Sequence, residues 1–322
     1  MSLHTRGLHH VTAIASDPQG NVDFHAGVLG LRLVKRTVNF DDPGTYHLYY
    51  GDGPGSPGTL ITFFPWPGAT RGRFGSGETS ATAYRIPRGS AGWWSKRLAS
   101  LHVATEPETA RFGAPVLAFS DSDGMRFELV EDDGGDGTEP WDGYSVPAEH
   151  AIRGFHSVTL ASRRPEVTAA VLTAMLGFSA AGESDGRQRF AAGTGGAPGI
   201  GGIVDLVAAP GPRGELGAGS VHHVAFRARD AAHQLEFQRA LAGNGMRVTD
   251  VADRCYFQSI YFREPGGVLF EVATDPPGMT LDEPLEKLGE RLQLPSWYES
   301  LRPKLEQSLP ALHVPDGAGV KP

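Results

Sequence analysis

Short runs of alternating hydrophobic and polar residues recur along the chain, separated by turns rich in glycine and proline. Alternation with a period of two is typical of β-strands, whereas apolar residues three and four positions apart predict helices. The helical pattern is found at residues 90–101 and 231–244. The expected strands cover residues 11–15, 32–40, 46–50, 59–64, 81–86, 109–112, 116–120, 125–130, 158–161, 221–227, 256–263 and 268–274.

The order of these elements reflects an internal repeat. Gly-Leu-His-His-Val-Thr at residues 7–12 returns as Gly-Phe-His-Ser-Val-Thr at residues 154–159, and Leu29-Gly30 returns at the same spacing as Leu176-Gly177. In both copies a short strand is followed by a helical stretch that ends in glycine, a common residue at helix C-termini. We therefore predict four βαβββ units, at about residues 7–65, 80–132, 153–208 and 220–275.

These units predict an α+β protein in two halves. An acidic stretch at residues 132–137 links the halves. The N-terminal pair of units is expected within residues 1–145, the C-terminal pair within residues 150–275, and a helical tail within residues 276–322. Within the tail, helical stretches are expected near residues 283–292 and 296–309.

Composition argues against several classes of protein. The formal net charge is −8, and no basic patch suggests a nucleic-acid partner. Cys255 is the single cysteine, so an internal disulfide and a cysteine-based metal site are excluded. No apolar run reaches the roughly 18 residues of a membrane span, and residues 1–6 lack the apolar core of a signal peptide. We therefore expect a cytoplasmic protein with no membrane partner.

Ionisable residues interrupt three of the expected strands. His9-His10 and His222-His223 stand at matching positions in the first strands of two units, and Glu271 lies between two apolar residues of a last strand. Because a buried carboxylate is costly unless it is paired or binds a cation, Glu271 suggests a metal site. Two imidazoles and one carboxylate suit an Fe(II)-type centre with open positions, and zinc can use the same set. Neighbouring strand residues point to opposite faces, so one histidine of each pair faces such a site.

These motifs resemble one family over roughly residues 6–285. The segments that carry the resemblance are Leu8-His9-His10-Val11-Thr12, residues 32–37, 46–50 and 55–64, His222-His223, and residues 265–271. Together they are similar to the hydroquinone-type ring-cleaving dioxygenases of the vicinal oxygen chelate superfamily, which includes glyoxalases, bleomycin resistance proteins and extradiol dioxygenases.

The resemblance implies roles for individual residues. The iron ligands of the family fall on His10, His223 and Glu271, the second histidine of each pair and the strand glutamate. Its outer-shell site residues fall on His9, Thr12, His222, Arg254 and Tyr261. For Arg254, a surface salt bridge with Asp250 or Asp253 is the alternative, and for Thr12 and Tyr261 the alternative is ordinary packing.

One departure from the catechol-cleaving relatives affects the expected fold. Their first histidine ligand lies in the third unit, where this chain has Ser157, so His10 of the first unit replaces it. If His10, His223 and Glu271 share one ion, the first and fourth units lie in one open barrel-like mixed sheet and the second and third in another. The equivalent Glu128 then has no histidine partners and is expected to be structural.

The function implied by the resemblance is extradiol-type cleavage of a substituted hydroquinone, with incorporation of both atoms of O2. The expected cofactor is Fe(II), with Mn(II) or Zn(II) possible in a purified sample, and the expected partners are a small aromatic diol, O2 and a possible second copy of the chain. The alternatives are a glyoxalase-like metal-dependent isomerase or lyase, and a non-catalytic protein that binds small aromatic molecules.

Overall fold

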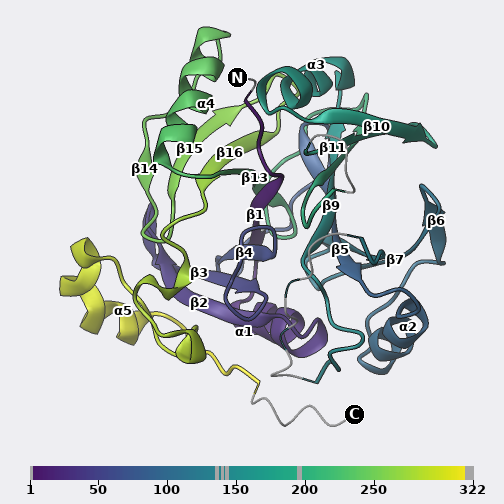
Figure 1. Ribbon diagram of the computed structural model, residues 1–322. Helices are drawn as coiled ribbons and strands as arrows, with labels where there is room; N and C mark the ends of the chain where they lie inside the picture. Colours follow the sequence, from purple (N-terminus) through teal and green to yellow (C-terminus); the bar gives the residue numbers. More distant parts are fainter. Residues whose placement is uncertain (1–2, 135–137, 139–140, 142–144, 194–197, 316–322) are drawn as a thin grey trace.

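The computed structural model describes residues 3–134, 138, 141, 145–193 and 198–315. Two curled mixed sheets lie beside each other, and the helices pack on their outer faces (Figure 1). The first sheet comprises, from edge to edge, β14 (Ala252–Asp253), β15 (Gln258–Arg263), β16 (Leu269–Thr274), β13 (Val221–Ala228), β1 (Leu8–Ala15), β4 (Leu60–Pro65), β3 (Asp42–Gly51) and β2 (Arg32–Asn39). The second sheet comprises β10 (Ser179–Ser184), β11 (Arg187–Ala191), β12 (Ile203–Ala208), β9 (Phe155–Ser162), β5 (Glu78–Ile86), β8 (Arg126–Glu131), β7 (Ala114–Ser120) and β6 (Thr109–Arg111).

The two sheets combine the units in the predicted way. The first sheet holds the strands of the first and fourth units, which join where β1 pairs antiparallel with β13. The second sheet holds the strands of the second and third units, which join where β5 pairs with β9. The predicted α+β fold of four βαβββ units, paired one with four and two with three, is therefore confirmed.

The helices of the units follow their first strands, as the repeat predicts. Gly30 and Gly177, the repeated glycines, have φ of +71° and +76°, so each adopts the left-handed conformation typical of a helix C-terminus. The helical elements of the units are α1 (Pro18–Val22) with the π-helix Asp23–Val28, α2 (Ala91–Ser100), α3 (Pro165–Ala170) with the π-helix Val171–Met175, and α4 (Ala231–Gly243). None of the described helices is long and apolar enough to cross a membrane.

The tail is less helical than predicted. The expected helix at 283–292 reduces to a 3-10 turn, Leu285–Lys287, because the chain bends at Gly289, whose φ is +80°. The tail also contains the 3-10 turns Met279–Leu281 and Ser296–Leu301, the second of which leads directly into α5 (Arg302–Ser308). The helix near 296–309 is thus confirmed only in its second half.

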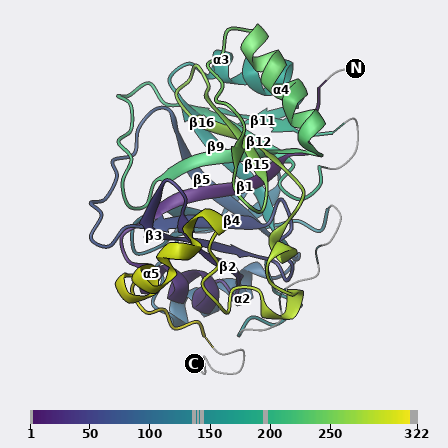
Figure 2. The same ribbon diagram turned by 90° about the vertical axis from the view of Figure 1, so that its left-hand side faces the viewer.

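The tail packs along β2 and β3 (Figure 2). The ammonium of Lys35 on β2 is fully buried and donates to Asp282 and Glu283 of the tail, at 2.5 Å each. The Tyr298 hydroxyl donates to the backbone oxygen of Phe40 at 2.9 Å. A segment far from the first unit in sequence therefore supports the end of its second strand.

The division of the chain into residues 1–145, 150–275 and 276–322 stays a prediction. Residues 135–137 of the expected acidic link, like residues 316–322 of the tail, lie outside the described residues.

Candidate metal centre and aromatic pocket

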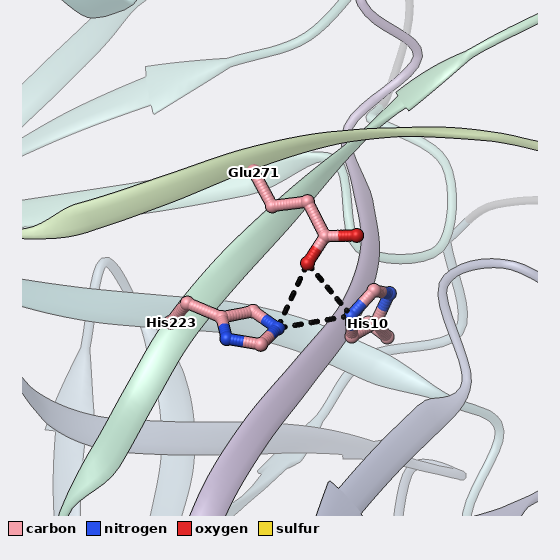
Figure 3. A group of neighbouring side chains, drawn as sticks. All are labelled: His10, His223 and Glu271. Carbon is pink, nitrogen blue, oxygen red and sulfur yellow. Dashed lines mark hydrogen bonds and ion pairs between the residues drawn. The ribbon is translucent and has the colours of Figure 1, made fainter. Parts of the chain in front are cut away.

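Three side chains from three neighbouring strands meet on the inner face of the first sheet (Figure 3). His10 on β1 and Glu271 on β16 both lie opposite Ala225 of β13 in the strand registers. His223 precedes Ala225 by two positions, and strand residues two apart share a face. Strand pairing therefore brings together three residues that are remote in sequence.

The spacing of the three side chains fits a single metal ion. Glu271 Oε2 lies 2.8 Å from His223 Nε2 and 3.3 Å from His10 Nε2, and the two nitrogens are 3.2 Å apart. Ligand bonds of about 2.1 Å at right angles would place donor atoms about 3.0 Å from one another. Apart from these two rings, no described residue donates a hydrogen bond to the buried Oε2 of Glu271.

The protonation states also suit a cation. Burial raises the pKa of Glu271, but the nearby His10 and His223 more than offset this effect and hold its pKa well below the ordinary value. Burial lowers the pKa of His223, although Glu271 opposes the shift. A metal needs an ionised carboxylate and neutral imidazoles, which these environments favour. Ser259 Oγ donates to Glu271 Oε1 and fixes the orientation of the carboxylate.

Each of these histidines is supported by the histidine that precedes it. The Nδ1 atoms of His9 and His10 lie 2.9 Å apart, as do those of His222 and His223. An imidazole that offers Nε2 to a metal carries its proton on Nδ1, and the preceding ring can accept that proton in a hydrogen bond. Burial, with the neighbouring His10, lowers the pKa of His9 well below its ordinary value, and burial lowers that of His222 to about 4. Both supporting rings are therefore neutral near pH 7.

A small pocket of about 170 Å³ opens beside the three side chains. Engineered cavities of about 150 Å³ hold benzene, so this volume suits one substituted six-membered ring. Its aromatic walls are Phe40, Tyr49, Phe64, Trp66, Phe257 and Tyr261, and its polar groups are His10, His47, His222, His223, Asn39, Asp41 and Arg254.

Arg254 lies at this pocket rather than in the expected alternative pairs. Its guanidinium donates from Nε to Tyr261 Oη at 3.1 Å and forms an ion pair with Asp41 at 3.1 Å. The alternative of a salt bridge with Asp250 or Asp253 is thus not what the structure shows. Burial raises the pKa of Tyr261, so its phenol stays protonated near neutral pH.

The remaining outer-shell residues are placed differently from one another. His222 lines the pocket, whereas His9 lies behind His10, with its Nε2 buried and without a hydrogen-bond partner among the described residues. Thr12 is fully buried, and its hydroxyl lies 2.8 Å from that of Thr62. Thr12 is therefore close to the metal ligands in the sheet but does not line the pocket.

Several pocket residues received no role from the sequence, among them two on β3. His47 and Tyr49 on β3 both line the pocket, and Tyr49 Oη lies 2.9 Å from His47 Nδ1. A histidine that interrupts an apolar strand was the available signal, as it was for the His-His pairs. Unlike those pairs, His47 has no repeated counterpart in the chain.

The second sheet has no equivalent metal centre among its described residues. Glu128 on β8 corresponds to Glu271, but it forms ion pairs with Arg111 and Arg126, as expected for a structural residue. Ser157 takes the place of His10, and its hydroxyl lies 3.0 Å from the Nδ1 of His156.

Comparison with known families identifies the class of protein. The family model for the Glyoxalase/Bleomycin resistance protein/Dioxygenase superfamily matches residues 7–129 and 154–272, and the chain belongs to this superfamily. The two matches cover nearly all of the four predicted units, two in each half. Glyoxalase I from Zea mays has the same fold, with a TM-score of 0.63 and 16% identity over 88% of this chain and 97% of that one.

More similar relatives point to one branch. The chain is 48% identical to MhqO of Bacillus subtilis (strain 168), whose name gives ring-cleaving dioxygenase as a provisional activity, over 96% of this chain and 97% of the relative. It is 39% identical to the chlorohydroquinone/hydroquinone 1,2-dioxygenase of Sphingobium indicum, over 94% of this chain and 95% of that relative. A crystal structure of a Bacillus subtilis protein, described provisionally as a dioxygenase, gives a TM-score of 0.93 at 46% identity and covers 98% of this chain and 100% of that one.

Proposed function

We propose that the protein is an Fe(II)-dependent dioxygenase that opens the ring of a substituted hydroquinone with O2. The observation that carries the proposal is the set of His10, His223 and Glu271 beside a pocket sized for one aromatic ring. Three protein ligands on one face leave coordination positions for a substrate oxygen and for O2. The name of the Sphingobium indicum relative supports a hydroquinone as the ring.

Iron bound here would supply the redox chemistry that joins the aromatic ring to O2. The protein contributes the rest of the site. The rings of Phe257 and Phe64 confine the substrate, and His10, His223 and Glu271 would hold the iron beside one of its hydroxyls. The hydroxyls of a hydroquinone are para, so only one of them can reach this centre. The bond to be broken then joins the hydroxylated carbon to its unhydroxylated neighbour, in an extradiol-type cleavage.

The outer-shell residues act on charge and protons. We assign to Arg254 the stabilisation of negative charge that develops on the substrate oxygens. Its hydrogen bond orients Tyr261, whose protonated phenol can donate to a reacting oxygen. His222 faces the pocket as a neutral ring whose Nδ1 accepts from His223, so its Nε2–H can donate a hydrogen bond to a substrate oxygen. His9 orients the ring of His10, and Thr12 packs opposite His223 in the sheet, with its hydroxyl bonded to Thr62.

The alternative on the same scaffold is a glyoxalase-like isomerase or lyase. Such chemistry uses a further carboxylate as a ligand or base. Among the described residues, the three-residue group contains only one carboxylate, and Asp41 at the pocket is paired with Arg254. A non-catalytic binder of aromatic molecules would not need the converging ligand set. The arrangement therefore favours O2 chemistry over both alternatives.

Oxygen uptake tests the proposal directly. The protein is reconstituted anaerobically with Fe(II), mixed with methylhydroquinone or chlorohydroquinone, and followed with an oxygen electrode. We expect uptake by the wild type and by His313→Ala, which changes an exposed histidine, and none by His10→Ala. Uptake with catechol but with no hydroquinone would reject the substrate class. Turnover without oxygen, supported by Mn(II) or Zn(II), would favour the isomerase.

A further inference from the structure

A row of hydrogen-bonded side chains crosses the inner face of the first sheet. Tyr49 Oη lies 2.9 Å from His47 Nδ1, His47 Nε2 lies 2.8 Å from Thr62 Oγ1, and Thr62 Oγ1 lies 2.8 Å from Thr12 Oγ1. Tyr49, Thr62 and Thr12 are almost completely buried. The proposed function leaves Tyr49, His47 and Thr62 without a role.

This row leads from Thr12, beside the candidate metal ligands, to Tyr49 on β3, which forms the opposite wall of the pocket. Thr12 on β1 lies directly opposite His223 of β13 on one side and Thr62 of β4 on the other. Thr62 in turn lies opposite Tyr49 on β3. Tyr49 is therefore two strands away from β1, a separation of about 10 Å along the sheet. The first sheet is curled (Figure 1), and Tyr49 lines the same pocket as the metal ligands His10 and His223.

His47 and Tyr49, the two residues of this row that line the pocket, differ in their remaining hydrogen-bonding capacity. Both ring nitrogens of His47 are already engaged, one by Tyr49 and one by Thr62, so His47 has no polar atom left for a ligand. The phenol of Tyr49 has one donor and two acceptor positions, of which His47 uses one. Tyr49 can therefore make a second hydrogen bond in the pocket, and His47 determines its direction.

We propose that Tyr49 binds the substrate hydroxyl that does not reach the metal, and that His47 is a positioning residue for the Tyr49 phenol. This inference rests on the proposed function, since it assigns a partner to the second hydroxyl of a para-diol. The two hydroxyls of a catechol are adjacent, so when one is at the metal the other is far from β3. Tyr49 thus selects para-diols over ortho-diols.

A thermodynamic cycle on binding tests the contact without turnover. The Zn(II)-loaded protein is titrated anaerobically, by calorimetry, with hydroquinone and with 4-methylphenol, which replaces the second hydroxyl by a methyl group. We expect the wild type to prefer hydroquinone by about tenfold, the value of one hydrogen bond, and Tyr49→Phe to bind the two equally. Equal preference in the wild type, or an unchanged preference in Tyr49→Phe, would overturn the inference.

The role of His47 is tested with two matched amides. His47→Asn places an amide near the position of Nδ1, which contacts Tyr49, whereas His47→Gln places it near Nε2, which contacts Thr62. We expect His47→Asn to retain more of the preference for hydroquinone than His47→Gln. The reverse order would contradict positioning through Tyr49. Tyr46→Phe is the control, because the Tyr46 hydroxyl donates to Pro310 in the tail, outside the pocket.

The Fe(II) enzyme separates this inference from the proposed function. Tyr49→Phe should lower kcat/KM for hydroquinone about tenfold, mainly through KM. If the wild type shows no oxygen uptake with any hydroquinone while the binding cycle behaves as expected, the proposed reaction fails and the binding role of Tyr49 stands. If uptake is present and the cycle shows no coupling, only the role of Tyr49 fails.

Discussion

Replacement of Lys35 by methionine should destabilise the protein strongly. The Lys35 side chain has no exposed surface, and its ammonium lies between Asp282 and Glu283 and 4.9 Å from the ring centre of Tyr256. Lys35→Met keeps the apolar stem and removes the charge. Two carboxylates then remain at the junction of β2 and the tail without their cation, and one of them, that of Glu283, is buried.

The magnitude follows from the burial of the ammonium. Removal of one partner from a buried ion pair typically costs about 3–5 kcal/mol, because the other charge is left uncompensated. An unfolding entropy of about 2.1 cal/mol/K per residue corresponds to roughly 0.7 kcal/mol/K for a chain of this length. Lys35→Met should therefore lower Tm by about 4–7 °C.

Thermal unfolding followed by circular dichroism measures this shift. The triple variant Lys35→Met, Asp282→Asn, Glu283→Gln also removes the two carboxylate charges that Lys35→Met leaves unpaired. We expect it to recover most of the lost stability. Arg73→Met is a control on an exposed ion pair with Glu215 and should change Tm by less than about 1 °C. A Tm of Lys35→Met within 1 °C of the wild type would refute the reasoning, as would a triple variant less stable than the single one.

Three further predictions follow from other parts of the structure. Glu271→Ala should abolish metal retention in elemental analysis, whereas Glu128→Ala should retain metal and lose stability; metal loss in both would contradict the distinction between the two sheets. Burial lowers the pKa of His25 from 6.5 to about 3, so stability is lost as pH falls below 6.5, because the unfolded chain takes up the proton first. His25 contributes about 2 kcal/mol to this loss at pH 5, so in urea unfolding His25→Phe should lose about 2 kcal/mol less stability than the wild type between pH 7 and pH 5. Asp41 is 74% exposed in its pair with Arg254, so Asp41→Asn should change the unfolding free energy by less than about 1 kcal/mol but lower kcat/KM severalfold; unchanged kinetics would show that the pair does not orient Arg254.

Much of the candidate metal site was predictable because its signal is local. His9-His10 and His222-His223 are adjacent pairs, and their repetition needs no knowledge of the fold. The choice of the second histidine came from the family resemblance, and its physical reason is visible only in the structure. Strand register places His10 and Glu271 opposite the same residue, Ala225.

The pocket wall and the tail were less predictable because they depend on contacts between distant segments. Tyr49 becomes a pocket residue only when the sheet curls and β3 lies across from β15. The tail shows a helical pattern at residues 283–292, but its conformation follows from docking. Gly289 packs so closely against the backbone of Leu33 that a side chain would not fit, and this contact overrides the local preference.

The origin of the ligands in the first and last units has a consequence for biosynthesis. His10 and His223 are separated by 213 positions, and Glu271 follows only near the end of the last unit. The binding site therefore has a very high contact order and forms late, after β13 and β16 have been made and have paired with β1. A nascent or truncated chain that lacks the fourth unit cannot assemble the ligand set. Binding of an ion by these three residues would thus be confined to molecules that have completed their fold.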